Sequence, residues 1–386
     1  MKRLLFLLVG FCLAFSALLS FTSDLFGKAN ARTTKQARTM STVASNSPAK
    51  TNDWQLGQPI TYENLTIFPV VSNAKASSEE FITLDEGLRT KTVKVKEIGG
   101  TSTRTVRPSR SAHHSNQVQQ QRLINTGDNA EVNRVMVTNN SGKTLVLIAG
   151  EIIVGGKQDR IVGQDCIVAS TNKPVPVDVF CVEHGRWRDT ASRRQPGVAN
   201  EGASFGSANN VMAAPKVRAK AQAEKSQSAV WDEVASQVSK NRVTTSTGNL
   251  NSVFADKKVN AKLEDYEKAV APKLATGNVI GAVAAVNGKI ISADVFASPL
   301  LFKAYRAKLC RSYALEAVSA NGQQKGKANA DDAKAFLSRD EGAEKTTEKE
   351  GVYRLSEKQS SADASFTLEH TTKDRKLIHY SKVKKN

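Results

Sequence analysis

Short runs rich in valine and isoleucine alternate with turn-forming residues between positions 131 and 182, and this pattern constrains the fold more than any other feature of the chain. β-branched residues favour extended strands, and clusters of Asn, Ser, Gly and Pro favour the turns between them. Four strands are predicted: 131–138, a second at 144–148 that continues to 152–154, 161–169 and 175–182. The first two should form a hairpin across the turn at 139–142, and the second should run on through Gly150. We therefore expect an antiparallel sheet or sandwich in this part of the chain.

Helical periodicity replaces this pattern further along the chain. Apolar residues at 230, 231, 234 and 238, and again at 263, 266 and 270, predict two amphipathic helices. Asn287-Gly288 between two apolar runs predicts a tight hairpin, and Ser298 before Pro299 is typical of a helix start. The fold class predicted from these elements is α+β: an antiparallel sheet or sandwich core followed by helices and a β-hairpin, with flexible basic loops.

Composition indicates that part of the chain is not packed. A chain of 386 residues that is 40% hydrophobic and 6% aromatic has less core-forming material than its length implies. The α+β domain is expected at 54–320, interrupted by a mobile basic loop at 99–121 and a long loop at 185–219. The remaining segments are a disordered leader at 32–53, a linker at 321–350 and a β-rich C-terminal tail at 351–386.

The N-terminus has the features of an export signal. Lys2 and Arg3 precede an uncharged apolar run from 4 to 19, and Ala29-Asn30-Ala31 offers a small-x-small cleavage point. We predict a secretory signal peptide at 1–31, with the protein secreted or periplasmic. The alternative is an uncleaved N-terminal membrane anchor that extends through Phe21 and Leu25.

Three cysteines remain after the predicted cleavage, and their odd number excludes a fully paired disulfide framework. Cys166, Cys181 and Cys310 lack the spacing of a metal site, so we predict buried thiols and no metal or cofactor. A bridge from Cys166 to Cys181 across neighbouring strands is the alternative.

Residues 150–160 end a predicted strand in a pair of glycines followed by polar residues. Gly155 and Gly156 let the backbone turn its N–H groups toward an anion, and Lys157, Gln158 and Arg160 could hold phosphate or carboxylate. The spacing matches neither a Walker loop nor a dinucleotide fingerprint. The alternative is a simple Gly-Gly turn with solvated charges.

A second candidate lies where the strand at 175–182 ends, with Glu183, His184, Arg186 and Trp187 in close succession. Trp187 could stack on a ring, Arg186 could bind phosphate, and Glu183 could bind a hydroxyl or act as a base. The alternative is a tryptophan packed into the core between exposed arginines.

Glu151 and Glu183 each stand beside a strand that joins a glycine-containing turn. If their carboxylates meet, repulsion would raise one pKa and create an acid–base pair suited to hydrolysis. If they pair with Arg160 and Arg186 instead, they are scaffolding for an anion site. Asn249 and Asp294 follow in segments that could complete the site, although Asp294 is also explained as a strand-end residue.

The wording and order of these segments resemble the ARG and rhodanese-phosphatase superfamily-associated protein domain family over residues 54–318. The resemblance is carried by GEIIVGGKQDR at 150–160 and FCVEHGRW at 180–187, with 65–71, the helix around Trp231, 247–254 and 280–299 in the same order. The family name associates it with ADP-ribosyl-glycohydrolase-type and phosphatase-type domains. The resemblance implies a nucleotide-derived or ADP-ribose-like ligand, and it carries no catalytic residues with it.

Three functions are compatible with the sequence. The first is an exported module that binds a phosphorylated, nucleotide-derived or ADP-ribose-like small molecule. The second is a metal-independent hydrolase of such a ligand that uses Glu151 or Glu183. The third follows from the net charge of +18 and is an envelope protein whose basic loops contact polyanions or a membrane surface without specificity. Because aromatic residues are not interleaved with the basic ones, no specific nucleic-acid partner is expected.

Overall fold

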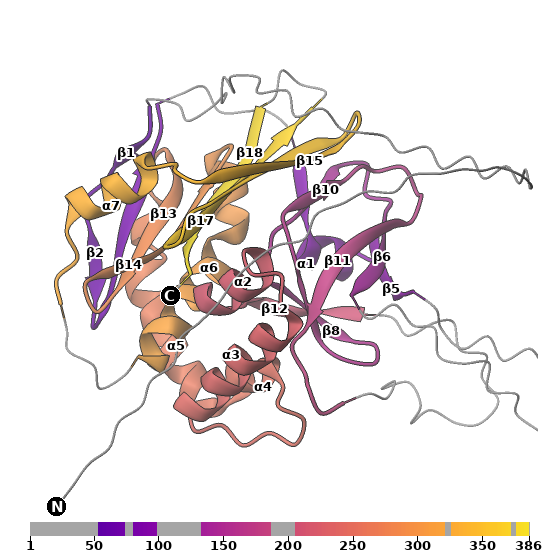
Figure 1. The fold of residues 1–386 in the computed structure, drawn as a ribbon, viewed down its shortest axis with the longest axis horizontal. Coiled ribbons are helices and arrows are strands. Elements are labelled where there is room, and N and C mark those ends of the chain that lie inside the picture. Colours follow the sequence, from indigo (N-terminus) through magenta and orange to yellow (C-terminus); the bar gives the residue numbers. More distant parts are fainter. Residues whose placement is uncertain are drawn as a thin grey trace, which may run out of the picture. The chain divides into compact units, whose positions relative to one another are not determined.

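The computed structural model describes residues 53–73, 80–98, 133–186, 205–320, 326–371 and 376–385, which form an α+β fold as predicted (Figure 1). The predicted signal peptide, the basic loop at 99–121 and all but the last residue of the leader lie outside these ranges. No described helix is long and apolar enough to cross a membrane.

The largest sheet is antiparallel and joins the beginning, middle and end of the described chain. Its order is β1-β3-β13-β14-β18-β17-β16-β15, and β2 also pairs with β3. The strands are β1 Gln55–Leu56, β2 Ile60–Tyr62, β3 Leu65–Val71, β13 Val279–Val286, β14 Lys289–Phe296, β15 Ala343–Lys349, β16 Tyr353–Gln359, β17 Asp363–His370 and β18 Lys376–Lys384. The β13–β14 hairpin turns at Asn287 and Gly288 with φ of 51° and 79°, as the sequence predicts.

The strands between 81 and 212 form two smaller sheets. One has the order β12-β8-β9-β11-β6-β5, and the other has the order β10-β7-β4 with β4 and β7 parallel. Their bounds are β4 Phe81–Thr83, β5 Val93–Glu97, β6 Arg134–Asn139, β7 Thr144–Leu147, β8 Glu151–Gly155, β9 Arg160–Val162, β10 Cys166–Val168, β11 Val175–Cys181 and β12 Phe205–Met212.

The predicted hairpin between 131–138 and 144–148 is wrong, because β6 and β7 belong to different sheets. The Asn139 side chain donates to the carbonyls of Lys143 and Val168, both at 2.8 Å, and so holds the turn against the end of β10. The predicted continuation through Gly150 also fails. Gly150 has φ of 93°, and this left-handed residue separates β7 from β8.

Helices cover both faces of the large sheet. They are α1 Leu84–Arg89, α2 Pro215–Gln222, α3 Gln227–Lys240, α4 Leu250–Ala255, α5 Lys257–Val270, the 3₁₀ helix η2 Lys273–Ala275, α6 Pro299–Ser319 and α7 Ala330–Ser338. The predicted apolar stripes lie in α3 and α5. The Ser298 hydroxyl accepts the Leu301 N–H at 3.2 Å, so the predicted start of α6 is confirmed.

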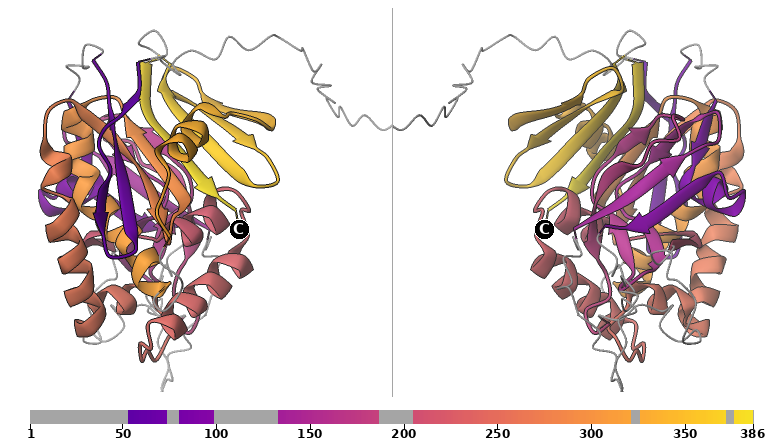
Figure 2. Two further views of the ribbon diagram at one scale, coloured as in Figure 1. Left: turned by 90° about the vertical axis from the view of Figure 1, so that its left-hand side faces the viewer. Right: turned by 90° about the vertical axis from the view of Figure 1, so that its right-hand side faces the viewer.

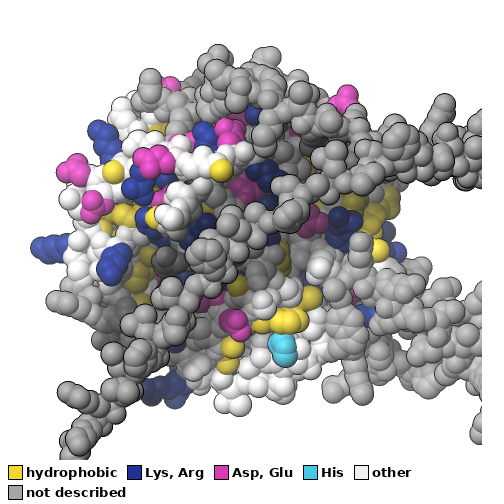
Figure 3. Space-filling model, in the orientation of Figure 1, with side chains coloured by type: hydrophobic (Ala, Val, Ile, Leu, Met, Phe, Trp, Pro, Cys, Tyr) yellow, Lys and Arg dark blue, Asp and Glu magenta, His cyan; other side chains and the backbone are white. Residues whose placement is uncertain are grey.

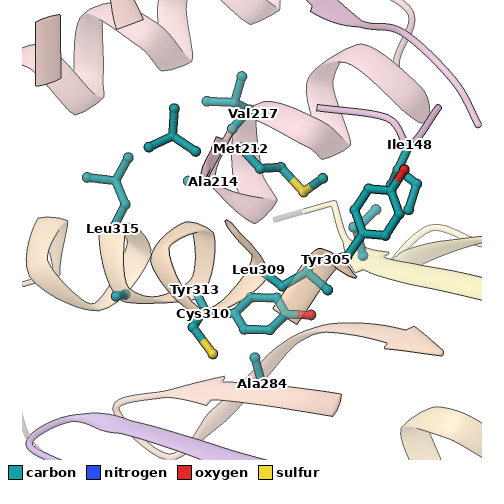
Figure 4. Packing of buried hydrophobic residues seen from close by; sticks show 14 of the residues in the cluster. Ile148, Met212, Ala214, Val217, Ala284, Tyr305, Leu309, Cys310, Tyr313 and Leu315 are labelled. Carbon is teal, nitrogen blue, oxygen red and sulfur yellow. The ribbon is translucent and has the colours of Figure 1, made fainter. Parts of the chain in front are cut away.

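Helix α6 lies at the centre of the main core. Figure 4 shows Tyr305, Leu309 and Tyr313 of α6 among Met212, Val217 and Ala284. The Tyr305 hydroxyl donates to the Val146 carbonyl at 2.8 Å, which ties the helix to the three-stranded sheet. α6 therefore holds α2, the large sheet and the three-stranded sheet together.

Two segments that the sequence predicts as irregular contain regular structure. The described part of the predicted linker at 321–350 forms α7 and β15, and that of the predicted loop at 185–219 forms β12 and the first turns of α2. α7 buries Ala333, Phe336 and Leu337 against Phe68 and Val283, which is a stripe too short to stand out in the sequence. The strands of the predicted tail extend the large sheet through β14–β18 pairing (Figure 2).

The last strand of this sheet, β15, is exposed along almost its whole length. It pairs with β16 on one side, and no described strand pairs with its other side. Its side chains are mainly Glu, Lys and Thr, which are typical of an edge strand protected against further pairing.

The three cysteines are free and buried, as the sequence favours. Burial raises the pKa of Cys166 and of Cys310 to about 12, so both thiols stay protonated near neutral pH.

Gly281 in β13 has no room for a side chain. A Cβ atom there would lie 2.3 Å from the Asp294 carbonyl oxygen, and backbone cannot move away cheaply. We predict that Gly281→Ala lowers the free energy of unfolding by about 2–3 kcal/mol, measured by urea denaturation. Gly206→Ala is the control, because the nearest atom to that Cβ is 4.0 Å away. Equal effects of the two substitutions would contradict the packing described for β13.

Candidate functional site

The two turns singled out by the sequence lie in contact. The Arg186 guanidinium donates from Nη1 to the Gly156 carbonyl, from Nη2 to Asp159 Oδ1, both at 2.9 Å, and from Nε to Glu183 Oε2 at 2.7 Å. The Gln158 amide donates to the Glu183 carbonyl at 2.7 Å. The structure thus brings the β8–β9 turn and the segment after β11 to one place.

The segment before α4 completes this arrangement. The Asn249 amide donates to Asp159 Oδ2 and the Thr247 hydroxyl donates to Glu183 Oε1, both at 2.7 Å. Asn249 also caps α4 by accepting the Asn251 N–H, so its position is fixed by the helix start. We call Gly156, Asp159, Glu183, Arg186, Thr247 and Asn249 the turn cluster.

The anion-binding geometry expected of Gly155 and Gly156 is present, but carboxylates of the chain itself accept its N–H groups. The Gly155 N–H donates to Asp159 at 2.9 Å and the Lys157 N–H donates to Glu97 at 3.0 Å. Gly156 has φ of 56°, and a Cβ atom there would lie 2.5 Å from the Glu97 carboxylate. The turn therefore binds Glu97 and Asp159 where the sequence predicts an external anion.

Arg160 serves the same internal arrangement. It is fully buried and forms a bidentate pair with Glu97 at 2.8 and 2.9 Å, with its guanidinium over the Phe205 ring. An arginine that is buried and paired in this way is not accessible to a ligand from solvent.

The two acids of the turn cluster have pKa values displaced in opposite directions. Burial raises the pKa of Asp159 against the opposing hydrogen bonds from Gly155 and Asn249. Burial acts on Glu183 in the same sense, but hydrogen bonds from Arg186 and Thr247 outweigh it and lower the pKa. One guanidinium between two carboxylates makes a poor phosphate site, and the arrangement fits the scaffolding alternative of the sequence analysis.

Glu151 does not meet Glu183. It lies at the other end of β8. The length per residue of a β-strand puts it roughly 13 Å from the β8–β9 turn. Its carboxylate accepts from Lys308 Nζ at 2.7 Å and from the Ile148 N–H at 2.8 Å, and Lys308 also pairs with Asp85. Asp159 takes the place beside Glu183 that the sequence analysis gives to Glu151.

Asp294 lies in the middle of β14 rather than at a strand end, and it is fully buried. Arg218 donates to both of its oxygens at 3.0 and 2.5 Å, and the Tyr313 hydroxyl donates at 2.5 Å. His379 Nε2 lies 3.3 Å from the same carboxylate, and its Nδ1 lies 2.7 Å from Asp165. We call these five residues the buried ion network.

The members of the buried ion network shift one another's pKa values. Burial alone would raise the pKa of Asp294, but Arg218 and His379 hold it well below its usual range. Burial would lower the pKa of His379, but Asp165 and Asp294 outweigh it and raise the value to about 9. The network contains no solvent-exposed residue, so Asp294 holds the fold and is not part of an open site.

His184 does not add to the turn cluster. His184 is exposed, and its ring meets the Trp231 ring edge-on with centroids 4.5 Å apart. Trp187 lies outside the described residues. No group of His, Cys, Asp and Glu in the described ranges is arranged to hold a metal ion.

A cavity of about 890 Å³ lies elsewhere, along the tip of the β13–β14 hairpin. α7, the end of α6, the start of α2 and the end of β18 contribute its walls. Its charged lining residues are the basic Lys216, Lys289, Arg339 and Lys384 and the acidic Glu316 and Asp332. We call this cavity the hairpin groove. Figure 3 shows Lys and Arg side chains interspersed with Asp and Glu on the side of the surface where α7 and β14 lie.

Lys216 and Glu316 neutralise each other at one end of the hairpin groove. Their charged atoms are 2.8 Å apart. Burial raises the pKa of Glu316, and Lys216 opposes this. The rest of the lining holds three basic side chains and one acidic one. This groove is not predictable from the sequence, because Arg339 and Lys384 lie in the predicted linker and tail. The basic residues Lys382, Lys384 and Lys385 are the only local signal for it.

Comparison with known proteins gives one family. The profile described as the ARG and Rhodanese-Phosphatase-superfamily-associated Protein domain matches residues 53–383. The match continues past residue 318 through α7 and β15 to β18, in line with the incorporation of these elements in the large sheet. Searches of curated proteins and of solved structures give no match.

The buried ion network predicts a stability that falls at alkaline pH. The pKa of His379 is about 9 in the folded chain and about 6.5 when unfolded, so its contribution is complete below pH 6.5 and is lost as pH rises through 9. We expect a loss of up to about 3 kcal/mol between these values, measured by urea denaturation across the pH range.

His379→Gln provides the control for this prediction. The variant should be less stable than the wild type at pH 6, and the difference between the two should shrink toward pH 9. If the difference stays constant with pH, His379 is neutral in the folded protein and the charge assignment is wrong.

Proposed function

From the premise that the chain belongs to the ARG and Rhodanese-Phosphatase-superfamily-associated Protein domain family, we propose that it binds a phosphorylated, nucleotide-derived small molecule in the hairpin groove. The family name associates it with phosphatase-type proteins, whose substrates carry phosphate. The ligand class is the one expected from the sequence, while the position differs from the two turns that the sequence favours.

The excess of basic side chains in the hairpin groove is the observation that carries this proposal. Small-molecule sites usually have volumes of about 300–1,000 Å³, and this cavity lies within that range. Lys289, Arg339 and Lys384 outnumber the acid Asp332 in the lining and Asp363, which pairs with Arg339 and Lys384, so the lining attracts an anion. Apolar side chains between them, including Ile290 and Phe336, offer a surface for a base or sugar.

The turn cluster supports this function indirectly. Its donors are already paired with Asp159 and Glu183, so its role in the proposal is to fasten β8, β11 and α4 together. A ligand held by Gly155, Lys157 or Arg160 would have to displace the Asp159 or Glu97 carboxylate first.

A hydrolase remains the second candidate, and the opposite pKa displacements of Asp159 and Glu183 favour it. Two neighbouring carboxyl groups whose pKa values are displaced in opposite directions can serve as acid and base. In this alternative Glu183 is the base and Asp159 is the acid, and Glu151 takes no part because Lys308 and Asp85 surround it.

The proposal includes export of the chain and contact of its basic loop with anionic surfaces. We propose that residues 1–31 direct the chain to a secreted or periplasmic location, with a membrane anchor as the alternative, on the evidence of the charged start and apolar run. The basic loop at 99–121 would give weak, salt-sensitive contact with polyanions or an anionic membrane surface.

Ligand binding should raise thermal stability. We predict that ADP-ribose, AMP or ribose 5-phosphate at millimolar concentration raises the Tm of the wild type by about 2–4 °C in a thermal-shift assay. Lys289→Glu places a like charge in the groove and should abolish the shift. Lys334→Glu, on the exposed side of α7, should leave it unchanged. Absence of any shift with all three compounds would refute binding in the groove.

The hydrolase alternative has its own test. If the turn cluster is catalytic, Glu183→Gln and Asp159→Asn should each lower the release of ribose 5-phosphate from ADP-ribose by about 10²-fold or more while the Tm shift persists. Thr61→Ala is the control, because Thr61 lies in β2 and contacts neither site. Turnover that survives both carboxylate substitutions removes this mechanism.

A further inference from the structure

The geometry points to a phosphate subsite at one end of the hairpin groove, where Arg339 and Lys384 together hold a dianionic phosphate monoester. This inference rests on the proposed function and assigns the charged end of the ligand to two named side chains. Neither residue is part of the turns that the sequence singles out.

The Asp363 carboxylate pairs with both Arg339 and Lys384 and so fixes the positions of their charged groups. Asp363 is buried at the start of β17 and lies 2.8 Å from Arg339 Nη2 and 3.4 Å from Lys384 Nζ. Lys382 Nζ also lies 3.6 Å from this carboxylate. The neighbouring acid Asp340 also acts on Lys382, but it is paired with Lys358 at 2.9 Å. Because the three basic groups surround Asp363 and Asp340 has a basic partner of its own, the cluster keeps an excess of positive charge that a bound anion would relieve.

The three basic residues around Asp363 differ in how much of each side chain is exposed to solvent. Lys382 is buried, donates to the Arg339 carbonyl and lies over the Phe336 ring, so it supports the end of α7. Arg339 and Lys384 have 44% and 31% of their side chains exposed, and both line the hairpin groove. They are held in place and still open to a ligand.

Phe336 forms the apolar base of the subsite. It lies in the last turn of α7, and Arg339 is the residue that ends this helix three positions later. Lys384 Nζ lies 5.2 Å from the centre of its ring, and this contact limits the positions of the ammonium group. The Arg339 guanidinium and the Lys384 ammonium line the same cavity as this ring, and together they offer donors for several phosphate oxygens.

The charge of the cluster favours a dianion. Three basic groups around one carboxylate leave two positive charges, which match a terminal phosphate at neutral pH. A phosphodiester carries one negative charge and would leave part of the excess. We therefore expect a monoester such as ribose 5-phosphate to bind more tightly than a diester of similar size.

The test measures the affinity of ribose 5-phosphate and of sulfate for the full chain by calorimetry at pH 7.5 and pH 5.0. The second phosphate pKa is about 6, so the dianion fraction falls about tenfold between these conditions. We expect the affinity for ribose 5-phosphate to fall about tenfold and that for sulfate, a dianion at both values, to change by less than twofold. An equal change for both anions would overturn the dianion assignment.

Variants locate the subsite. Arg339→Gln and Lys384→Gln should each weaken ribose 5-phosphate at pH 7.5 at least tenfold, while Lys334→Gln on the same helix should not. Lys384→Gln leaves the Arg339–Asp363 pair intact, so its thermal denaturation should stay close to that of the wild type. One outcome would refute the subsite alone: the wild type binds the ligands and Lys289→Glu abolishes binding, but Arg339→Gln and Lys384→Gln have no effect. The proposed function would then stand. If no anion binds the wild type, both fail.

Discussion

The pairing of Asp294 with Arg218 and His379 is the interaction on which the rest of the fold depends. These groups are fully buried, and a buried charge costs several kcal/mol unless it is paired and hydrogen-bonded. The pairing joins the middle of β14 to α2 and to β18, and Tyr313 adds α6. Since β18 also pairs with β14, the C-terminal strands have to be in place before these charges can be buried together.

Local rules account for much of the fold, and long-range contacts account for what the sequence could not reveal. Asn287-Gly288 and Ser298 act within a few residues, so the β13–β14 hairpin and the start of α6 could be predicted. The choice of a strand's partner depends on distant residues. Asn139 fastens its turn to Val168, and no nearby pattern indicates that β6 and β7 belong to different sheets.

The candidate sites show the same division. The sequence leaves open whether the acids beside the two turns meet, and in the structure Arg186 links the turns. Their role was not predictable, since Glu97 accepts the Lys157 N–H from 60 residues earlier in the chain. The hairpin groove combines five separate segments, and one of them, the predicted linker that forms α7, has too few apolar residues to indicate order. Its acids and bases become neighbours only when the tail completes the sheet.

The exposed edge of β15 has a consequence for self-association. Suppose that the β15 strands of two copies pair antiparallel about a twofold axis. The residue on the axis then lies opposite its own copy, and every other residue lies opposite one that is an even number of positions away, because cross-strand partners share a face of the sheet. A register centred on Thr346 sets Glu344 against Glu348, and one centred on Thr347 sets Lys345 against Lys349. The remaining registers centred within the charged part of the strand set a charged residue against itself. Like charges opposite each other are unfavourable, so this edge discourages two copies from dimerising through β15 while leaving the backbone open to a different strand.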